Sequence, residues 1–346
     1  MRTWPALGLL LTAALLLGAP AAVPASAQSP ADNPAGQSAV QETEAPSGAS
    51  RHVVKVGALV NDIQQLDLSS HSYNVDMYMW FKWSDPDIDP SRSFEFMNAF
   101  ELWGHILTYA TDKPERLPDG SYYQVLRNQG KFNTKLPLER YPFDTQHLVV
   151  ELEDGTENES SLVFVPDDDP IDLSRDLTIP GWDIDEPQLR VVSNRYDTDF
   201  GNPADERAPY SRLIIDVPVV RPTGTYALKL LLPMLLVALT ALLALMVHPR
   251  YVEGRIGIGI TALLTLVALQ LTNNSSLPEV NYLMLLDKLY LVSYGFVVLT
   301  LAMIVRNSWV EARDDDRAKG ATRRSLVILA LVYFTVIGAV LLQSLA

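Results

Sequence analysis

The chain has 346 residues, no cysteine and a formal net charge of −14. Residues 28–221 hold 34 Asp and Glu against 16 Lys and Arg, whereas residues 222–346 hold 7 against 10. The acidic first half argues against a nucleic-acid partner and favours cations or cationic ligands. Without cysteines, no disulfide holds this half together.

The N-terminus has the pattern of a secretory signal peptide. Arg2 precedes the apolar run 7–19, and Ala25-Ser26-Ala27 is a small-residue cleavage site. We expect residues 1–27 to be removed. Residues 28–50 have almost nothing to bury and are expected to form a disordered leader. The domain that follows is therefore predicted to be exported, to the periplasm or the extracellular side.

Residues 51–221 alternate short apolar and aromatic runs with turn signals, a pattern typical of an all-β sandwich. Turns are expected at Asp85-Pro86, Pro118-Asp119-Gly120 and Asp154-Gly155, and a loop at 166–170. The predicted strands are Val53–Val60, Tyr73–Trp83, Tyr122–Arg127, Gln146–Glu153, Gln188–Val192 and Arg212–Val219.

Residues 222–346 are predicted to form a four-helix transmembrane bundle. Its apolar segments cover about 228–247, 256–271, 282–305 and 325–345, each long enough or nearly long enough to cross a bilayer. The linker 306–324 carries six Lys and Arg, whereas residues 272–281 carry none. Basic loops stay in the cytoplasm, so the chain is predicted to be a multi-pass protein of the cell (inner) membrane.

The second apolar segment carries small and polar residues at helical spacing. On a helix one face would present Gly257, Thr261, Leu264, Ala268 and Thr272, with Glu253 just before it. This face fits a pore liner. It also fits an ordinary buried helix whose threonines bond their own backbone.

The most specific motif is Tyr141-Pro142-Phe143-Asp144. It resembles the signature loop of the pentameric ligand-gated ion channels, the Cys-loop receptor superfamily, in its bacterial branch. The resemblance runs from about Val53 to the end of the chain. Further matches are Trp83 with Asp85, Gly181-Trp182-Asp183-Ile184, Arg221, Leu232-Pro233-Met234 and Leu277-Pro278.

This resemblance implies a ring-shaped homopentamer that conducts ions through the membrane. Glu253 would form a ring of carboxylates that selects cations, and Leu264 would form an apolar gate. The family's anion channels usually carry a Pro-Ala insertion near this point, which residues 251–255 lack. Coupling between the domains is implied for Asp67, Tyr141, Pro142, Phe143, Asp144, Arg221, Leu277 and Pro278. Within this set, Asp144 and Arg221 match positions that pair in the family, so the resemblance implies a contact between them.

The ligand cannot be identified from the sequence, so the agonist is an unknown small molecule or ion. Aligned through the signature loop, Gly155 stands where animal receptors often carry a tryptophan of the aromatic cage. Four other aromatics remain as candidates for a cage around a cation, or as ordinary surface aromatics: Tyr78, Tyr196, Phe200 and Tyr210.

Acidic residues gather in two further places. Asp167, Asp168 and Asp169 form one run, and Glu153 and Glu157 flank a turn. A solvated acidic surface and a modulatory Ca²⁺ site are both compatible with these residues.

No catalytic constellation or other cofactor motif is present, so an enzyme is not expected. A transporter would carry ionisable residues at mid-membrane, and these spans do not. A non-conducting, membrane-anchored receptor with the same fold remains the alternative to a channel.

Overall fold

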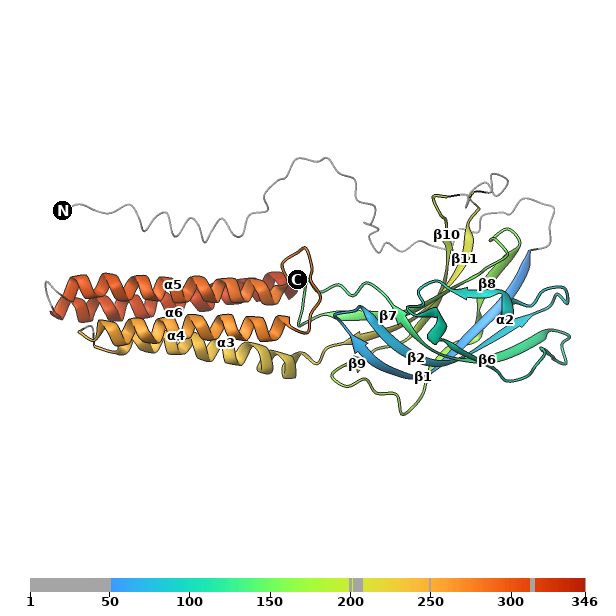
Figure 1. Cartoon of the computed structure of the whole chain (residues 1–346), viewed down its shortest axis with the longest axis horizontal. Helices are drawn as coiled ribbons and strands as arrows, with labels where there is room; N and C mark the ends of the chain where they lie inside the picture. The colour runs from blue at the N-terminus through green and yellow to red at the C-terminus, as the bar shows by residue number, and fades with distance from the viewer. Residues whose placement is uncertain (1–50, 199–200, 202–207, 249, 312–314, 346) are drawn as a thin grey trace. The chain divides into compact units, whose positions relative to one another are not determined.

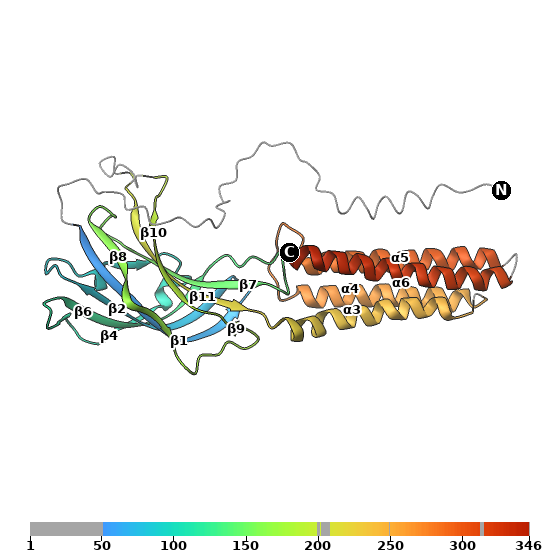
Figure 2. The ribbon, with the colours of Figure 1, turned by 180° about the vertical axis from the view of Figure 1, so that it is seen from behind.

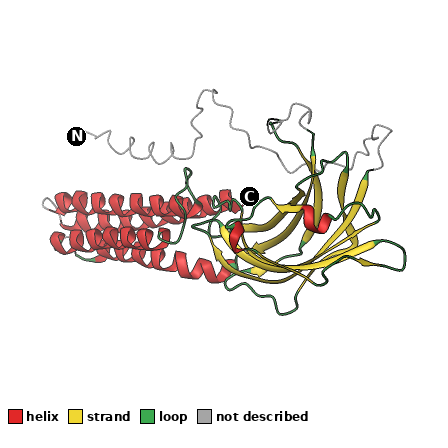
Figure 3. Cartoon of the chain, turned by 45° about the vertical axis from the view of Figure 1, so that its right-hand side comes forward, coloured by secondary structure: helices red, strands yellow, loops and turns green. Residues whose placement is uncertain are grey.

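The computed structural model describes residues 51–198, 201, 208–248, 250–311 and 315–345. The side chains of 311–319 and 344–345 are not among those described. The expected signal peptide and leader lie outside the described residues. Figure 3 shows a strand-rich region followed along the chain by long helices.

The strand-rich region holds two short helices, α2 (Pro90–Ser93) and the 3₁₀ helix η1 (Leu102–Gly104). Its strands are β1 (His52–Asp67), β2 (Ser72–Trp83), β3 (Phe94–Phe96), β4 (Ile106–Tyr109), β5 (Glu115–Arg116), β6 (Tyr122–Asn133), β7 (Thr145–Asp154), β8 (Leu162–Leu173), β9 (Asp183–Ile184), β10 (Gln188–Asn194) and β11 (Tyr210–Val220).

These strands form two sheets. The first sheet has the order β4-β6-β2-β1-β8, with β5 paired to β6. The second has the order β10-β11-β7-β3, with β9 paired to β11. The pairing of β1 with β8 is parallel, and the other pairings among the described strands are antiparallel.

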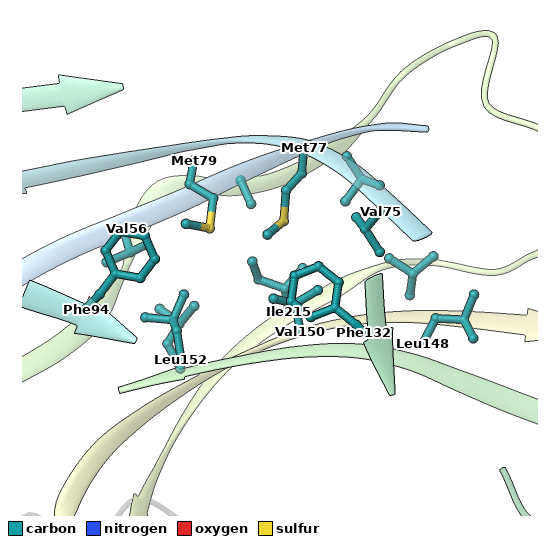
Figure 4. Close-up of a cluster of buried hydrophobic side chains, with 14 of the residues drawn as sticks. Val56, Val75, Met77, Met79, Phe94, Phe132, Leu148, Val150, Leu152 and Ile215 are labelled. Carbon is teal, nitrogen blue, oxygen red and sulfur yellow. The ribbon is translucent and has the colours of Figure 1, made fainter. Parts of the chain in front are cut away.

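The core lies between the two sheets and explains the alternation in the sequence. In β2 and β7 every second side chain points inward, because successive residues of a strand face opposite sides. Figure 4 shows Met77 and Met79 from β2 above Val150 and Leu152 from β7. All four side chains are buried. The expectation of a β-rich, two-sheet region is therefore confirmed.

One local expectation is wrong. Residues 166–170, expected to form a loop, lie inside β8. The register jumps from Val56↔Pro166 to Ala58↔Ile171, so β8 bulges opposite Gly57. Because β8 is an edge strand, its prolines remove no hydrogen bond that a neighbouring strand needs, and the bulge accommodates them.

Four long helices follow the strands: α3 (Thr223–Met246), α4 (Val252–Asn274), α5 (Leu285–Glu311) and α6 (Asp315–Leu345). Each contains a window apolar enough and long enough to cross a membrane. Figures 1 and 2 show them running side by side. The four apolar helices expected from the sequence are therefore present, and the chain has the features of a membrane protein.

Candidate pore helix and domain junction

The face of α4 that packs against the other helices is narrow. Its buried residues are Arg255, Gly259, Ala262 and Leu266, spaced by four, three and four. A Cβ on Gly259 would lie only 2.4 Å from a methyl group of Leu301, so the absence of a side chain permits this close approach to α5. The rest of the circumference of α4 is far less covered within one chain.

The candidate pore face lies on the opposite side of α4. Glu253, Gly257, Thr261, Leu264, Ala268 and Thr272 are all exposed in the single chain. At 3.6 residues per turn, the middle of this face lies about half a turn from the middle of the buried face. Leu264 is 64% exposed although it is a large apolar residue. In a membrane this face would therefore contact a pore, lipid or another protein surface.

The threonines on this face have a defined hydrogen-bond polarity. Thr261 donates its hydroxyl to the carbonyl of Gly257 at 2.9 Å, and Thr272 donates to that of Ala268 at 2.9 Å. This is the bonding expected of an ordinary helix, and it has a further consequence. With the proton used internally, each hydroxyl oxygen presents lone pairs outward. Such a surface suits cations better than anions.

Arg255 does not share the exposure of Glu253. Its guanidinium is buried and donates to the carbonyls of Ala244 at 2.9 Å and Leu245 at 3.1 Å. These carbonyls belong to the last turn of α3, where no helical donor remains for them. Arg255 thus fixes the corner between α3 and α4 and leaves Glu253 on the exposed side of α4.

Asp144 and Arg221 form a buried ion pair where the strands meet the helices. Arg221 Nε lies 2.6 Å from Asp144 Oδ1, and both side chains are at least 96% buried. The second carboxylate oxygen accepts a hydrogen bond from Gln146. The contact expected between these residues is therefore present. Tyr141-Pro142, just before Asp144, is a cis peptide bond.

Three aromatic rings enclose the guanidinium of Arg221. It lies 4.0 Å from the ring centroid of Trp182, 4.8 Å from that of Tyr141 and 5.1 Å from that of Tyr226. Its Nη2 is buried without a hydrogen-bond partner in the described part of the chain. Cation–π attraction replaces the missing hydrogen bond. The rings come from the signature loop, the turn before β9 and the first turn of α3.

The loop between β6 and β7, which carries the signature motif and is called the signature loop below, also contacts the connection between α4 and α5. The backbone N–H of Leu138 donates to the hydroxyl of Tyr282 at 3.0 Å, and that of Leu285 donates to the carbonyl of Glu139 at 2.9 Å. Leu138 and Tyr141 are buried in the same apolar cluster as the helices. Leu277 belongs to that cluster too, next to Pro278 in the connection.

Asp67 caps its own loop. Its carboxylate accepts hydrogen bonds from Ser69 and Ser70, and these bonds hold its pKa below the usual value. The next residue, Leu68, packs against both the sandwich core and the helix cluster. The β1–β2 loop thus touches the junction through Leu68.

The aromatic residues considered for ligand binding fall into two groups. Tyr196 and Tyr210 lie beside the second sheet with ring centroids 5.8 Å apart. Tyr78 is on β2 in the first sheet, and Arg127 lies over its ring at 5.4 Å. Phe200 lies outside the described residues. Among the described residues, one chain by itself therefore does not bring Tyr78 together with Tyr196 and Tyr210.

The acidic residues are mostly engaged by cationic side chains. Glu153 is buried and accepts hydrogen bonds from Arg212 at 2.7 Å and from the Tyr196 hydroxyl at 2.9 Å. Burial alone would raise the pKa of Asp167, but hydrogen bonds from Lys82 and Trp80 outweigh it and lower the pKa.

The remaining residues of these acidic groups have other neighbours. Asp168 pairs with Lys55 at 3.0 Å, Asp169 is exposed, and Glu157 donates its backbone N–H to Asp154. Within the described residues, no group of three or more His, Asp or Glu is arranged to hold a metal ion. The Ca²⁺ site remains a prediction without support from this geometry.

No known protein-family model matches the chain. Two of the rings around Arg221, those of Trp182 and Tyr226, have no role that the sequence indicates, although Trp182 belongs to one of the motif matches. Tyr226 lies in the first turn of α3, and helical side chains tilt toward the N-terminus of their helix, so its ring can reach back to Arg221.

Proposed function

We propose that this chain is a subunit of a cation-conducting, ligand-gated channel of the pentameric superfamily. Copies of the chain would surround an axis and join through repeated heterologous contacts. The proposal places the exposed face of α4 on that axis, with Glu253 as the selecting carboxylate and Leu264 as the constriction.

The observation that carries this proposal is the opposition of the two faces of α4. A helix that only anchors a domain needs an apolar face toward lipid, and the side of α6 that is exposed in the single chain is apolar, with Val327, Ile328 and Leu331. The exposed side of α4 also carries the apolar residues Ile260, Leu264 and Leu271, but it interleaves them with the small and polar residues Gly257, Thr261, Ala268 and Thr272. Outward lone pairs on its threonines and the carboxylate of Glu253 favour a cation pathway.

The junction supplies a route from the strand-rich domain to this helix. Asp144 and Arg221 tie the signature loop to the start of α3, and the loop also contacts the α4–α5 connection. A ligand that rotated the sandwich would move the end of α4 through these contacts, as in other rigid-body switches. In a ring, Tyr78 of one copy could approach Tyr196 and Tyr210 of the next.

Ion currents of the purified chain in planar bilayers test the proposal. Leu264→Ser should hydrate the constriction and produce spontaneous current or greater sensitivity to an agonist. Leu331→Ser on α6 is a matched control, because Leu331 is also 64% exposed in the single chain. It should leave the current unchanged.

A second measurement tests the selectivity. Glu253→Gln should lower cation conductance and shift the reversal potential in asymmetric salt toward zero. Equal effects of Leu264→Ser and Leu331→Ser on the current would contradict the placement of α4 on the pore axis. A well-folded chain that never conducts, over a screen of ligands and pH values, would favour the non-conducting receptor.

A further inference from the structure

A cavity of about 610 Å³ lies at the end of α4 that meets the α4–α5 connection. Its walls come from the last turns of α4, the connection and the first turns of α5. The residues that define its chemistry are Gln270, Asn274, Glu279, Leu283, Asp287 and Leu291. None of the lining residues is Lys, Arg or His. Two carboxylates therefore face this space without a cation among the residues around it.

Asp287 is the most informative of these residues. It lies in the first turn of α5, inside a stretch apolar enough to cross a membrane. It forms no ion pair with any described residue. A carboxylate at the end of such a helix, without a cationic partner, is available to bind a cationic ligand.

The hydrogen bonds of Asp287 leave one oxygen weakly used. Oδ2 accepts the backbone N–H of Met284 at 3.2 Å and so caps the start of α5. Among the described residues, Oδ1 accepts only the amide N–H of Gln270, at 3.4 Å. The hydroxyl of Tyr294 donates to the Gln270 oxygen at 2.6 Å and holds that amide in place. Capping therefore accounts for one oxygen of Asp287 and not for the other.

The charged residues that line the cavity are both acids, Glu279 and Asp287. Asn274 lies in the same wall, but its Oδ1 is buried beyond the reach of a molecule in the cavity and has no hydrogen-bond partner among the described residues. The cavity therefore offers carboxylate acceptors, which favour a donor that carries positive charge.

The apolar walls define the rest of the ligand. Leu283 and Leu291 line the cavity and stay exposed in the single chain. A divalent metal ion fits poorly, because no set of three metal-binding side chains converges within the described residues. An ammonium group attached to an apolar body can donate hydrogen bonds to the carboxylates and pack against the two leucines.

We propose that this cavity binds an organic cation with an apolar body, such as an alkylammonium ion. The ammonium group donates to Asp287, and the alkyl chain lies along Leu283 and Leu291. If the chain is a channel, as proposed above, the occupant would also regulate opening. It would sit against α4 and against the connection whose Tyr282 contacts the signature loop.

Calorimetric titration of the full-length, detergent-solubilised protein with hexylammonium tests this site. Hexanol and hexanoate serve as neutral and anionic probes of equal chain length, and CaCl₂ as the divalent probe. We expect saturable binding of hexylammonium at least about tenfold tighter than that of hexanol, and no competition from Ca²⁺.

Asp287→Asn is the decisive variant, because it removes the charge and keeps an oxygen to cap α5. It should weaken hexylammonium binding about tenfold or more and leave hexanol binding unchanged. Glu186→Gln, an exposed acid outside the cavity, is the matched control. Equal affinities for hexylammonium and hexanol, no saturable binding, or full affinity in Asp287→Asn would overturn the proposal, and Ca²⁺ competition would reassign the cavity to a metal ion.

Binding is measured here without any current, so the two proposals fail separately. A chain that binds hexylammonium through Asp287 but never conducts would keep the site and lose the channel. A chain that conducts while Asp287→Asn binds hexylammonium normally would keep the channel and lose the site.

Discussion

The chain contains two aspartate–arginine pairs of similar geometry in very different surroundings. Asp144 and Arg221 lie 2.6 Å apart at the junction of strands and helices, with side chains 3% and 4% exposed. Asp76 and Arg127 also lie 2.6 Å apart, on the outer face of the first sheet, with side chains 17% and 37% exposed. The distance between the charges is therefore the same, and the access of water differs.

Their neighbours differ in the same way. Arg127 makes two hydrogen bonds to Asp76 and covers one ring, that of Tyr78. Arg221 donates one side-chain hydrogen bond to Asp144 and has three rings around it. By hydrogen bonds alone the outer pair is the better formed. Burial, and not pair geometry, should therefore decide what happens when one partner is removed.

The largest effect is expected from breaking the junction pair. Asp144→Asn and Arg221→Gln should each cost about 3–5 kcal/mol of unfolding free energy, because the remaining group stays buried without its partner. The double variant should lose less than the sum of the two single variants. Denaturant unfolding of the purified protein measures all three, and bilayer currents should show lost activation with unaltered ion selectivity. Strictly additive losses would mean that the two residues do not interact.

The rings around Arg221 provide the next test. Trp182→Leu removes the aromatic face at 4.0 Å and should lower the unfolding free energy by about 2 kcal/mol, whereas Trp182→Phe should keep most of the stability. Trp103→Leu is the control, since Trp103 is 87% exposed and should tolerate the same change. A loss that is equal for Phe and Leu at position 182 would assign the role to volume instead of cation–π attraction.

How far the sequence predicts the structure depends on whether the decisive contact is local. The four helices follow from apolar runs, and the inward and outward sides of β2 and β7 follow from period-two alternation. The pairing of Asp144 with Arg221 was expected only through the resemblance of the signature loop. Residues 77 positions apart leave no local pattern that would reveal such a contact.

The features that escaped prediction are those set by distant parts of the chain. The prolines of β8 indicated a loop, and the parallel pairing with β1 at a sheet edge overrode them. The ring of Trp182 reaches Arg221 because Gly181, with φ of +83°, makes a turn beside Tyr226 just before it. Arg255, near the start of α4, donates to a carbonyl in the last turn of α3, and no spacing in the sequence indicates this contact. Tyr78 lies in the first sheet and Tyr196 follows β10 of the second, and the sequence does not show which sheet a strand joins.

Breaking the outer pair should have a much smaller effect. Asp76→Asn and Arg127→Gln should each change the unfolding free energy by about 1 kcal/mol or less, because water solvates whichever group remains. The loss should shrink further as salt is added. Unfolding measured at low and high salt checks this. A loss as large as that of Asp144→Asn would refute the role given to burial in the comparison.

The smallest expected effect is the pH dependence of the outer pair. Hydrogen bonds from Arg127 hold the pKa of Asp76 below its usual value in the folded protein. A carboxyl group with a lowered pKa binds its proton more weakly when folded, so its contribution to stability is present above the pKa of the unfolded chain, about 3.9. That contribution is lost as the pH falls through the lower, folded value. The stability difference between the wild type and Asp76→Asn should therefore be constant between about pH 5 and 7 and shrink below about pH 4. Unfolding at matched salt over this range measures it. A difference that widened on acidification would mean that Asp76 is bound more tightly as the neutral acid, and the outer pair would then not be an ion pair.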